Sequence, residues 1–213
     1  NRAAAWWTDD PKYHPYRFGG YVLHKQKVGR ADIIASMNFN RTKGFIRQLD
    51  EEWIRATFKL RYRPKKNDRL SFGLLANLMD SREADYVFWA DADSNFYIPD
   101  GSNGPRDDGS ITSYQRKAVM IDPWVTYFDR GEGKHNLRLR FNYNRVMFTS
   151  SDPQNYLLIG EYQYQKKFDF GLRLTAGTQG QYFTLNDPRD LGVQRGTSGA
   201  VYAQADYQYK DWN

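Results

Sequence analysis

Apolar and polar residues alternate along several segments of this chain, most clearly between residues 134 and 177. One segment, 136–145, places Leu137, Leu139, Phe141 and Tyr143 on one side and Arg138, Arg140, Asn142 and Asn144 on the other. A strict period of two is the pattern of a β-strand with one apolar and one polar face. The same period returns in 156–165 and, after the Lys166-Lys167 turn, in 168–176. These two segments predict a β-hairpin.

The same alternation predicts six further strands. We expect them at residues 20–24, 32–40, 53–63, 69–78, 117–128 and 200–210. The strand at 117–128 contains Asp122-Pro123, and a proline inside a strand predicts a bulge or a local break in the hydrogen-bond ladder. The sequence therefore predicts nine strands and an all-β fold.

The connections predicted between these strands alternate in length. Short turns are expected at 25–30, 64–68, 129–135 and 166–167, and longer loops at 41–52, 79–116, around Asp152-Pro153 and at 178–198. In a meander, such an alternation would place every short turn at one end, as in outer-membrane barrels. A soluble β-sandwich is not expected to separate loop lengths in this way. We therefore predict an antiparallel up-and-down transmembrane β-barrel. Nine strands alone would leave an open sheet edge, which cannot face lipid, so we expect them to be part of a larger barrel.

Composition and charge placement agree with this interpretation. Of 213 residues, 16% are aromatic, mean hydropathy is −0.83, and no apolar run has the roughly 18 residues that a membrane-spanning helix needs. The absence of cysteine excludes disulfides, thiolate metal sites and cysteine nucleophiles. Tyrosines near strand ends on the apolar face predict an aromatic girdle. They are Tyr62, Tyr164, Tyr207 and Tyr209.

The formal net charge is +6, and basic residues fall on the polar face of the predicted strands. These expected lumen-lining residues are Arg55, Lys59, Arg61, Arg63, Arg138, Arg140 and Arg173. They can form ion pairs with lumen acids or a plug, or attract anionic ligands. Because they alternate with apolar residues and form no continuous exposed patch, the pattern disfavours nucleic-acid binding.

Aromatic residues in the predicted long loops are candidates for substrate contact, because exposed rings stack on sugars and other ring systems. They are Trp6, Trp7, Phe88, Trp89 and Tyr97. The alternative is that they pack the loops together. In the same region Asp91, Asp93 and Asn95 match the opening of a calcium loop. Phe96 and Ser102 replace the expected glycine and glutamate, so this is no EF-hand, and loosely bound calcium competes with a solvated acidic loop.

Catalytic patterns are weak. The three histidines, His14, His24 and His135, have no spacing typical of a metal site or a catalytic triad, and no serine nucleophile motif or phosphate-binding glycine loop occurs. We therefore expect no enzymatic activity and no resident cofactor beyond the possible calcium. A soluble or surface carbohydrate-binding β-protein, using the same aromatic loops, remains the alternative to a membrane protein.

Several short motifs, in their order and spacing, resemble TonB-dependent outer-membrane receptors of Bacteroidetes-type bacteria. They are Trp6-Trp7, His24 to Gly29, Arg61 to Pro64, Phe88 to Asp93, Ile121 to Pro123, His135 to Arg138 and Glu161 to Tyr164. The resemblance covers most of the chain, although no single motif is diagnostic. It implies a 22-stranded barrel filled by an N-terminal plug and driven by TonB.

By this resemblance, residues 1–213 would be one partial barrel domain in the bacterial outer membrane, without the plug and the C-terminal strands. The intact parent would import a scarce nutrient such as an iron-siderophore or cobalamin. Its partners would be outer-membrane lipid, TonB, the plug and the small nutrient ligand.

Overall fold

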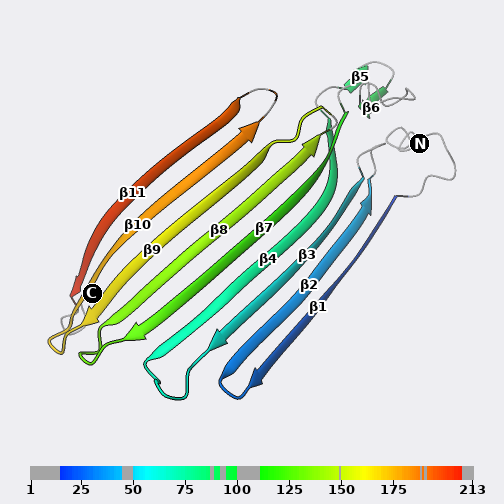
Figure 1. Ribbon diagram of the computed structural model, residues 1–213. Helices are drawn as coiled ribbons and strands as arrows, with labels where there is room; N and C mark the ends of the chain where they lie inside the picture. The colour runs from blue at the N-terminus through cyan, green and yellow to red at the C-terminus, as the bar shows by residue number, and fades with distance from the viewer. Residues whose placement is uncertain are drawn as a thin grey trace.

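Nine strands form one antiparallel sheet in the computed structural model, and each strand pairs with the next sheet strand along the chain (Figure 1). The structure describes residues 15–44, 50–86, 89–91, 95–99, 111–148, 150–187, 189 and 191–207. The nine strands are β1 (Tyr16–Val28), β2 (Ala31–Lys43), β3 (Glu51–Tyr62), β4 (Leu70–Tyr86), β7 (Ile111–Phe128), β8 (Lys134–Phe148), β9 (Gln154–Lys167), β10 (Leu172–Asp187) and β11 (Gly192–Tyr207). A separate two-stranded sheet consists of β5 (Trp89–Asp91) and β6 (Asn95–Pro99).

The predicted all-β, up-and-down antiparallel fold is thus confirmed. Over the described residues the sheet is open, with β1 at one edge and β11 at the other. Nowhere in this part of the chain is there a helix with the length and apolar character needed to cross a membrane.

The strands are longer than the alternation predicted, and the prediction of strictly alternating loop lengths is wrong. Most of 178–198 is strand, because β10 and β11 continue in register until Asp187 pairs with Gly192. Small and polar residues obscure the pattern there, but cross-strand aromatic rings compensate for the missing glycine side chains. Tyr202 lies against Gly177 and Phe183 against Gly196. A glycine that is covered by an aromatic ring of the neighbouring strand can therefore remain within a regular β-ladder.

Similarly, β4 and β7 extend well into the predicted loop at 79–116. The connections at one end of the sheet are residues 29–30, 63–69, 129–133 and 168–171. Those at the other end are 44–50, 87–110, 149–153 and 188–191. The connection at 87–110, which includes β5 and β6, is the long one among them (Figure 1).

The expected interruption at Asp122-Pro123 affects one ladder only. Strand β7 runs through both residues and keeps continuous register with β4, where Pro123 faces Leu74. On the other side, the ladder between β7 and β8 has no paired residues at positions 122 and 123. Proline has no N–H to donate, which accounts for the missing pairs in the β7–β8 ladder. The strand keeps its direction because its ladder with β4 is continuous.

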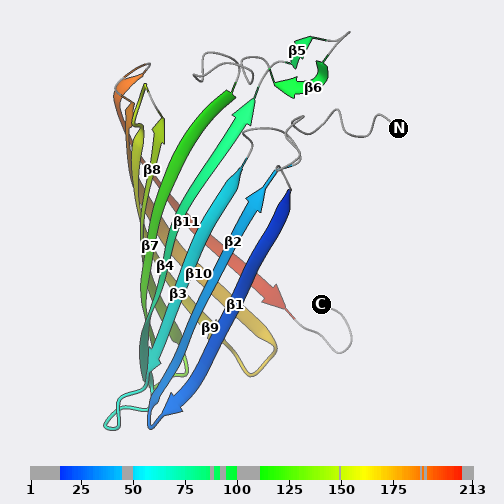
Figure 2. The same ribbon diagram turned by 90° about the vertical axis from the view of Figure 1, so that its right-hand side faces the viewer.

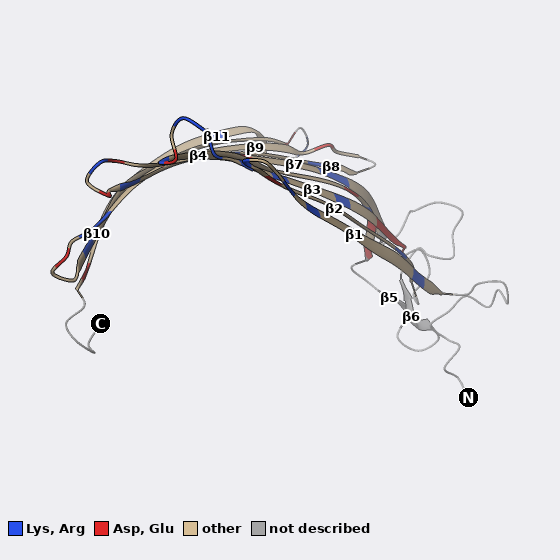
Figure 3. Ribbon diagram, turned by 90° about the horizontal axis from the view of Figure 1, so that it is seen from below, with Lys and Arg blue, Asp and Glu red and all other residues tan. Residues whose placement is uncertain are grey.

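The sheet is strongly curved, as the two turned views show (Figures 2 and 3). Its polar side chains converge on the inside of the arch, where Asp122 and Ser81 are each 1% exposed. Its apolar side chains spread on the outside, where Leu158 is 49% and Val201 84% exposed. No second layer of described residues packs against either face. The sheet therefore presents an exposed apolar convex face and a crowded polar concave face.

Candidate functional site

Asp122 is the most buried charged residue on the concave face, and two arginines of β8 hold it. Arg140 donates from Nε to Oδ1 at 2.9 Å and from Nη2 to Oδ2 at 2.7 Å. Arg138 donates from Nη2 to Oδ2 at 2.9 Å. The arginines lie two residues apart on the same side of β8, where Arg138 pairs with Trp124 and Arg140 faces the unpaired stretch of β7. One carboxylate thus fixes two guanidinium groups against the sheet.

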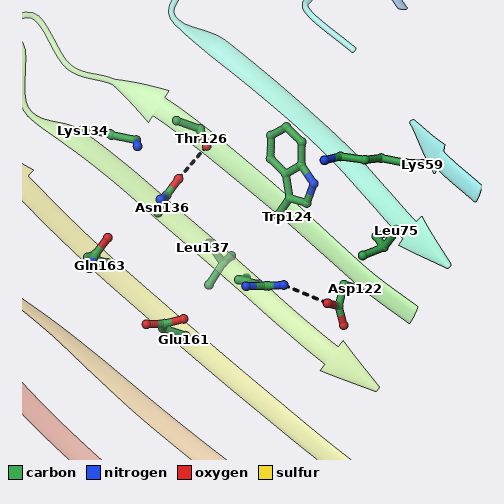
Figure 4. Close-up of a pocket in the computed structure, with 11 residues that line it drawn as sticks. Lys59, Leu75, Asp122, Trp124, Thr126, Lys134, Asn136, Leu137, Glu161 and Gln163 are labelled. Carbon is green, nitrogen blue, oxygen red and sulfur yellow. Dashed lines mark hydrogen bonds and ion pairs between the residues drawn. The ribbon is translucent and has the colours of Figure 1, made fainter. Parts of the chain in front are cut away.

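A hollow of about 460 Å³ opens beside this cluster (Figure 4). We call it the Trp124 hollow. It is lined by Lys59, Leu75, Asp122, Trp124, Thr126, Lys134, Asn136, Leu137, Arg138, Glu161 and Gln163. Apart from Leu137, these residues follow the concave side of five neighbouring strands, β3, β4, β7, β8 and β9.

Trp124 breaks the polar pattern of the concave face, and Gly73 provides the space for its ring. Gly73 faces Trp124 across the β4–β7 ladder. A Cβ atom added to Gly73 would lie 2.5 Å from Trp124 Cζ2, which is far inside van der Waals contact. The indole therefore lies close over the backbone of β4. This cross-strand contact holds the ring in a defined position in the hollow.

Most acceptor oxygens that line the hollow already accept hydrogen bonds, whereas several of its donor groups have no acceptor in the part of the chain that the structure describes. Thr126 donates to Asn136 Oδ1 at 2.6 Å, and Tyr202 donates to Glu161 Oε1 at 3.1 Å. The Asp122 carboxylate accepts from arginine, as described above. Within the described residues, the ammonium groups of Lys59 and Lys134 have no protein partner. In Figure 4, Lys59 extends across β4 toward Trp124.

The convex face carries two belts of aromatic residues, one toward each end of the strands. Near the end with the 29–30 turn lie Tyr62, Phe72, Tyr127, Tyr162, Tyr164 and Tyr207. Near the other end lie Tyr16, Phe18, Phe39, Tyr143, Tyr156 and Tyr182. Between the belts, no outward position of the nine strands carries Asp, Glu, Lys or Arg. Tyr209, also expected in a girdle, lies outside the described residues.

Charged residues appear on the convex face just beyond the second belt. Arg41 and Glu52 form an ion pair of 3.5 Å there. Asp80 of β4 and Lys117 of β7 face each other at the same end of the strands. The change from apolar to charged side chains is therefore abrupt, and it occurs on several adjacent strands.

At the opposite belt, His135 lies among tyrosines. Its Nδ1 is 2.7 Å from the Tyr162 hydroxyl, and its ring centroid is 4.9 Å from that of Tyr164. Its Nε2 is 3.3 Å from Oδ2 of Asp129, in the β7–β8 turn. The backbone N–H of Gly133, which donates at 2.8 Å, and then His135 lower the pKa of Asp129. Backbone and aromatic groups together order this turn.

The structure places the predicted basic residues in different settings. Arg61 and Arg63 pair with Asp32, at 2.7 and 3.3 Å. Arg138 and Arg140 pair with Asp122, and Lys59 lines the Trp124 hollow. The Nη2 atom of Arg55 lies 3.4 Å from Met79 Sδ. Arg173 lies opposite Asp206 in the β10–β11 ladder. Four of the seven arginine and lysine residues thus have acids of the same sheet as partners.

Of the predicted loop residues, some lie outside the described residues and the others are described by their backbone alone. Trp6, Trp7, Phe88 and Asp93 lie outside the described residues. Trp89 and Asp91 lie in β5, and Asn95 and Tyr97 in β6, but the structure describes only their backbone. Among described side chains, no group of three or more His, Cys, Asp or Glu is placed to hold a metal ion. The calcium hypothesis concerns residues outside that set.

Sequence reasoning missed Trp124, Lys134, Asn136 and Glu161 as parts of one site. A signal was present, because Trp124 is a tryptophan at a polar-face position of its strand. Which residues of the neighbouring strands lie beside it depends on register, which the alternation does not give. No known protein family matches this chain, and no curated protein has a significant sequence match to it.

Proposed function

We propose that this chain forms part of the wall of a transmembrane β-barrel in the bacterial outer membrane. The observation that carries the proposal is the convex face, where nine adjacent strands present an exposed band without charge between two aromatic belts. Soluble proteins rarely expose apolar patches larger than a few hundred Å². Membrane barrels have this arrangement, because the band faces hydrocarbon and the aromatic rings lie at the headgroups.

The height of the band supports this assignment. On β8 the belts are marked by His135 and Tyr143, and on β9 by Tyr164 and Tyr156, eight positions apart in each case. At about 3.3 Å per residue this is roughly 26 Å along the strand. A strand tilt of about 40° reduces it to roughly 20 Å along the barrel axis, close to the ~25 Å band of outer-membrane barrels.

The two free edges also bear on the proposal. In lipid, the unpaired N–H and C=O groups of β1 and β11 would each cost several kcal/mol, so both edges require partner strands. Further strands, continuing the curvature of Figure 3, would close the barrel. The polar concave face would then line its lumen, where Asp122 with its two arginines forms part of the wall.

For the parent protein we propose TonB-dependent import of a scarce nutrient, such as an iron-siderophore or cobalamin. This finer assignment is supported by the sequence motifs that resemble TonB-dependent receptors and by the polar concave wall. In this mechanism the outer loops capture the ligand, TonB remodels the plug, and the solute passes along the polar lumen. The sheet itself provides a rigid wall and takes no part in chemistry.

The test uses the full-length protein that contains this chain. Membranes are washed with alkaline carbonate and then extracted with detergent, and we expect the protein to leave the membrane only in detergent. Uptake of radiolabelled ferric siderophores and cobalamin is then compared in cells with and without TonB. Protein that stays monodisperse in buffer without detergent would reject the barrel, and glycan binding would then test the carbohydrate-binding alternative.

A further inference from the structure

From the geometry we infer that the Trp124 hollow binds an oxygen-rich organic anion, such as a sugar acid. The inference deepens the proposed function by naming a class of solute that the polar wall would bind. It rests on that function for the route by which the solute arrives, whereas the binding groups are properties of the concave face itself.

The first argument is the surplus of donors. Lys59 and Lys134 line the hollow without a partner among the described residues. The Nδ2 group of Asn136 likewise has no acceptor there, while its Oδ1 is oriented by Thr126. Groups of this kind gain from a ligand that brings acceptor oxygens and negative charge. A neutral apolar ligand would leave them unused.

The acceptors of the hollow are mostly occupied. Both oxygens of Asp122 accept from arginine, and the two guanidinium groups more than balance its charge. Glu161 uses Oε1 for the Tyr202 hydroxyl. Its Oε2 remains available to accept from a ligand hydroxyl. The lining therefore favours a ligand that has both hydroxyl groups and an anionic group, rather than a cation.

Size and shape favour an organic molecule over a bare ion. The volume of about 460 Å³ lies within the usual range for small-molecule sites. Lys59 is on β3 and Lys134 on β8, with β4 and β7 between them and an offset of six residues along the strands, so their backbones lie about 25 Å apart along the sheet. A bare ion held by one lysine would leave the other unused. The half-buried indole of Trp124 between them offers a flat apolar wall to the ligand's carbon skeleton.

The experiment uses purified full-length protein in detergent, labelled with 5-fluorotryptophan. The variant Trp124→Phe identifies the ¹⁹F resonance of Trp124. Glucuronate is titrated, with glucose as the neutral sugar of the same ring and inorganic phosphate as the bare anion. We expect glucuronate to shift the Trp124 resonance saturably, and at lower concentration than glucose or phosphate.

Charge variants then test the assignment. Lys59→Gln and Lys134→Gln should each weaken glucuronate binding about five- to tenfold, because each removes one ligand-facing charge at a partly solvated site. Lys25→Gln removes a lysine from the concave side of β1, two strands from Lys59 and outside the lining of the hollow, and should leave binding unchanged. Lys25 is therefore the matched control.

Three results would overturn the inference. They are glucuronate affinity that neither lysine variant changes, phosphate or glucose affinity equal to that of glucuronate, and a Trp124 resonance that no probe shifts. The last result would mean that another segment of the full-length protein fills the hollow. Carbonate extraction of the same preparation tests the barrel separately, so a membrane protein without anion binding would refute only this inference.

Discussion

Replacement of Leu139 by arginine tests the membrane assignment most directly. Leu139 lies on the convex face of β8, midway between His135 and Tyr143 of the two belts, and its side chain is 43% exposed. Four residues from each belt correspond to roughly 13 Å along the strand and roughly 10 Å in depth at a 40° tilt. Leu139 would therefore lie close to the midplane of the bilayer.

At that depth, arginine on the lipid face of a barrel costs about 2–4 kcal/mol, and near the interface only about 0–1 kcal/mol. On a water-exposed sheet the same substitution would change stability by less than about 0.5 kcal/mol. The two environments thus predict different results for one substitution. Tyr143→Arg, at the belt on the same strand, gives the interfacial comparison, and Asn142→Arg places the same charge on the concave face.

The assay is urea unfolding of the full-length protein in lipid vesicles, followed by the gel mobility of folded and unfolded barrels. We expect Leu139→Arg to lower the free energy of unfolding by about 2–4 kcal/mol, and Tyr143→Arg and Asn142→Arg by about 1 kcal/mol or less. Equal effects at all three positions, or no effect at Leu139, would refute the assignment of the convex face to lipid.

Three further substitutions test the concave face and the turns. Asp122→Asn should destabilise the sheet by about 2 kcal/mol in urea unfolding, because the charge that accepts three arginine hydrogen bonds is removed and one acceptor oxygen becomes an amide donor. The effect is limited because the arginines, 36% and 50% exposed, regain water. Gly73→Ala should lower the free energy of unfolding by about 1–3 kcal/mol in the same assay, since a Cβ would overlap the Trp124 ring and the backbone carbonyl oxygen of Leu60 in β3. For Asp129, the lowered pKa means that its contribution is present above pH 4 and is lost as pH falls through the folded pKa, so Asp129→Asn should flatten the loss of stability measured between pH 5 and 2.

Each of these has a matched control. Asp206→Asn changes an exposed carboxylate of the concave face and should alter the free energy of unfolding by less than about 0.5 kcal/mol. Gly180→Ala adds a Cβ that meets nothing within 4 Å, and should be neutral or slightly stabilising. Asp169→Asn removes an exposed carboxylate of the β9–β10 turn and should alter the free energy of unfolding by less than about 0.5 kcal/mol. An Asp122 or Gly73 variant as stable as its control, or an unchanged profile for Asp129→Asn, would contradict the argument for that residue.

The strands that sequence predicted best are those with a simple two-sided environment. Between Ile54 and Tyr62 of β3 and between Leu137 and Tyr143 of β8 every second residue is apolar, since each face of these segments has one kind of surroundings. Where glycine and small polar residues occupy both faces, as in β10 and β11, alternation disappears and a loop was predicted wrongly. There the strand depends on contacts such as Tyr202 on Gly177, which pair residues distant in the chain.

The same limit applies to the candidate site. Alternation places Arg138 and Arg140 on the polar face, but in the sequence Asp122 is distinguished only as the neighbour of a proline. Its role follows from the register of β7 against β8, which brings its carboxylate within 2.7 Å of Arg140. The Trp124 hollow likewise depends on five strands aligned side by side, so no local pattern could reveal it.

The sequence by itself determined the fold class, the number of strands in the main sheet and the two-faced character of each strand. It could do so because side-chain direction along a strand follows directly from the period of the backbone. Only the tertiary structure decided the strand ends, the curvature, the ion pairs of the concave face and the joining of the apolar strips into one band. These depend on register between strands, which is set by long-range pairing rather than by neighbours in the chain.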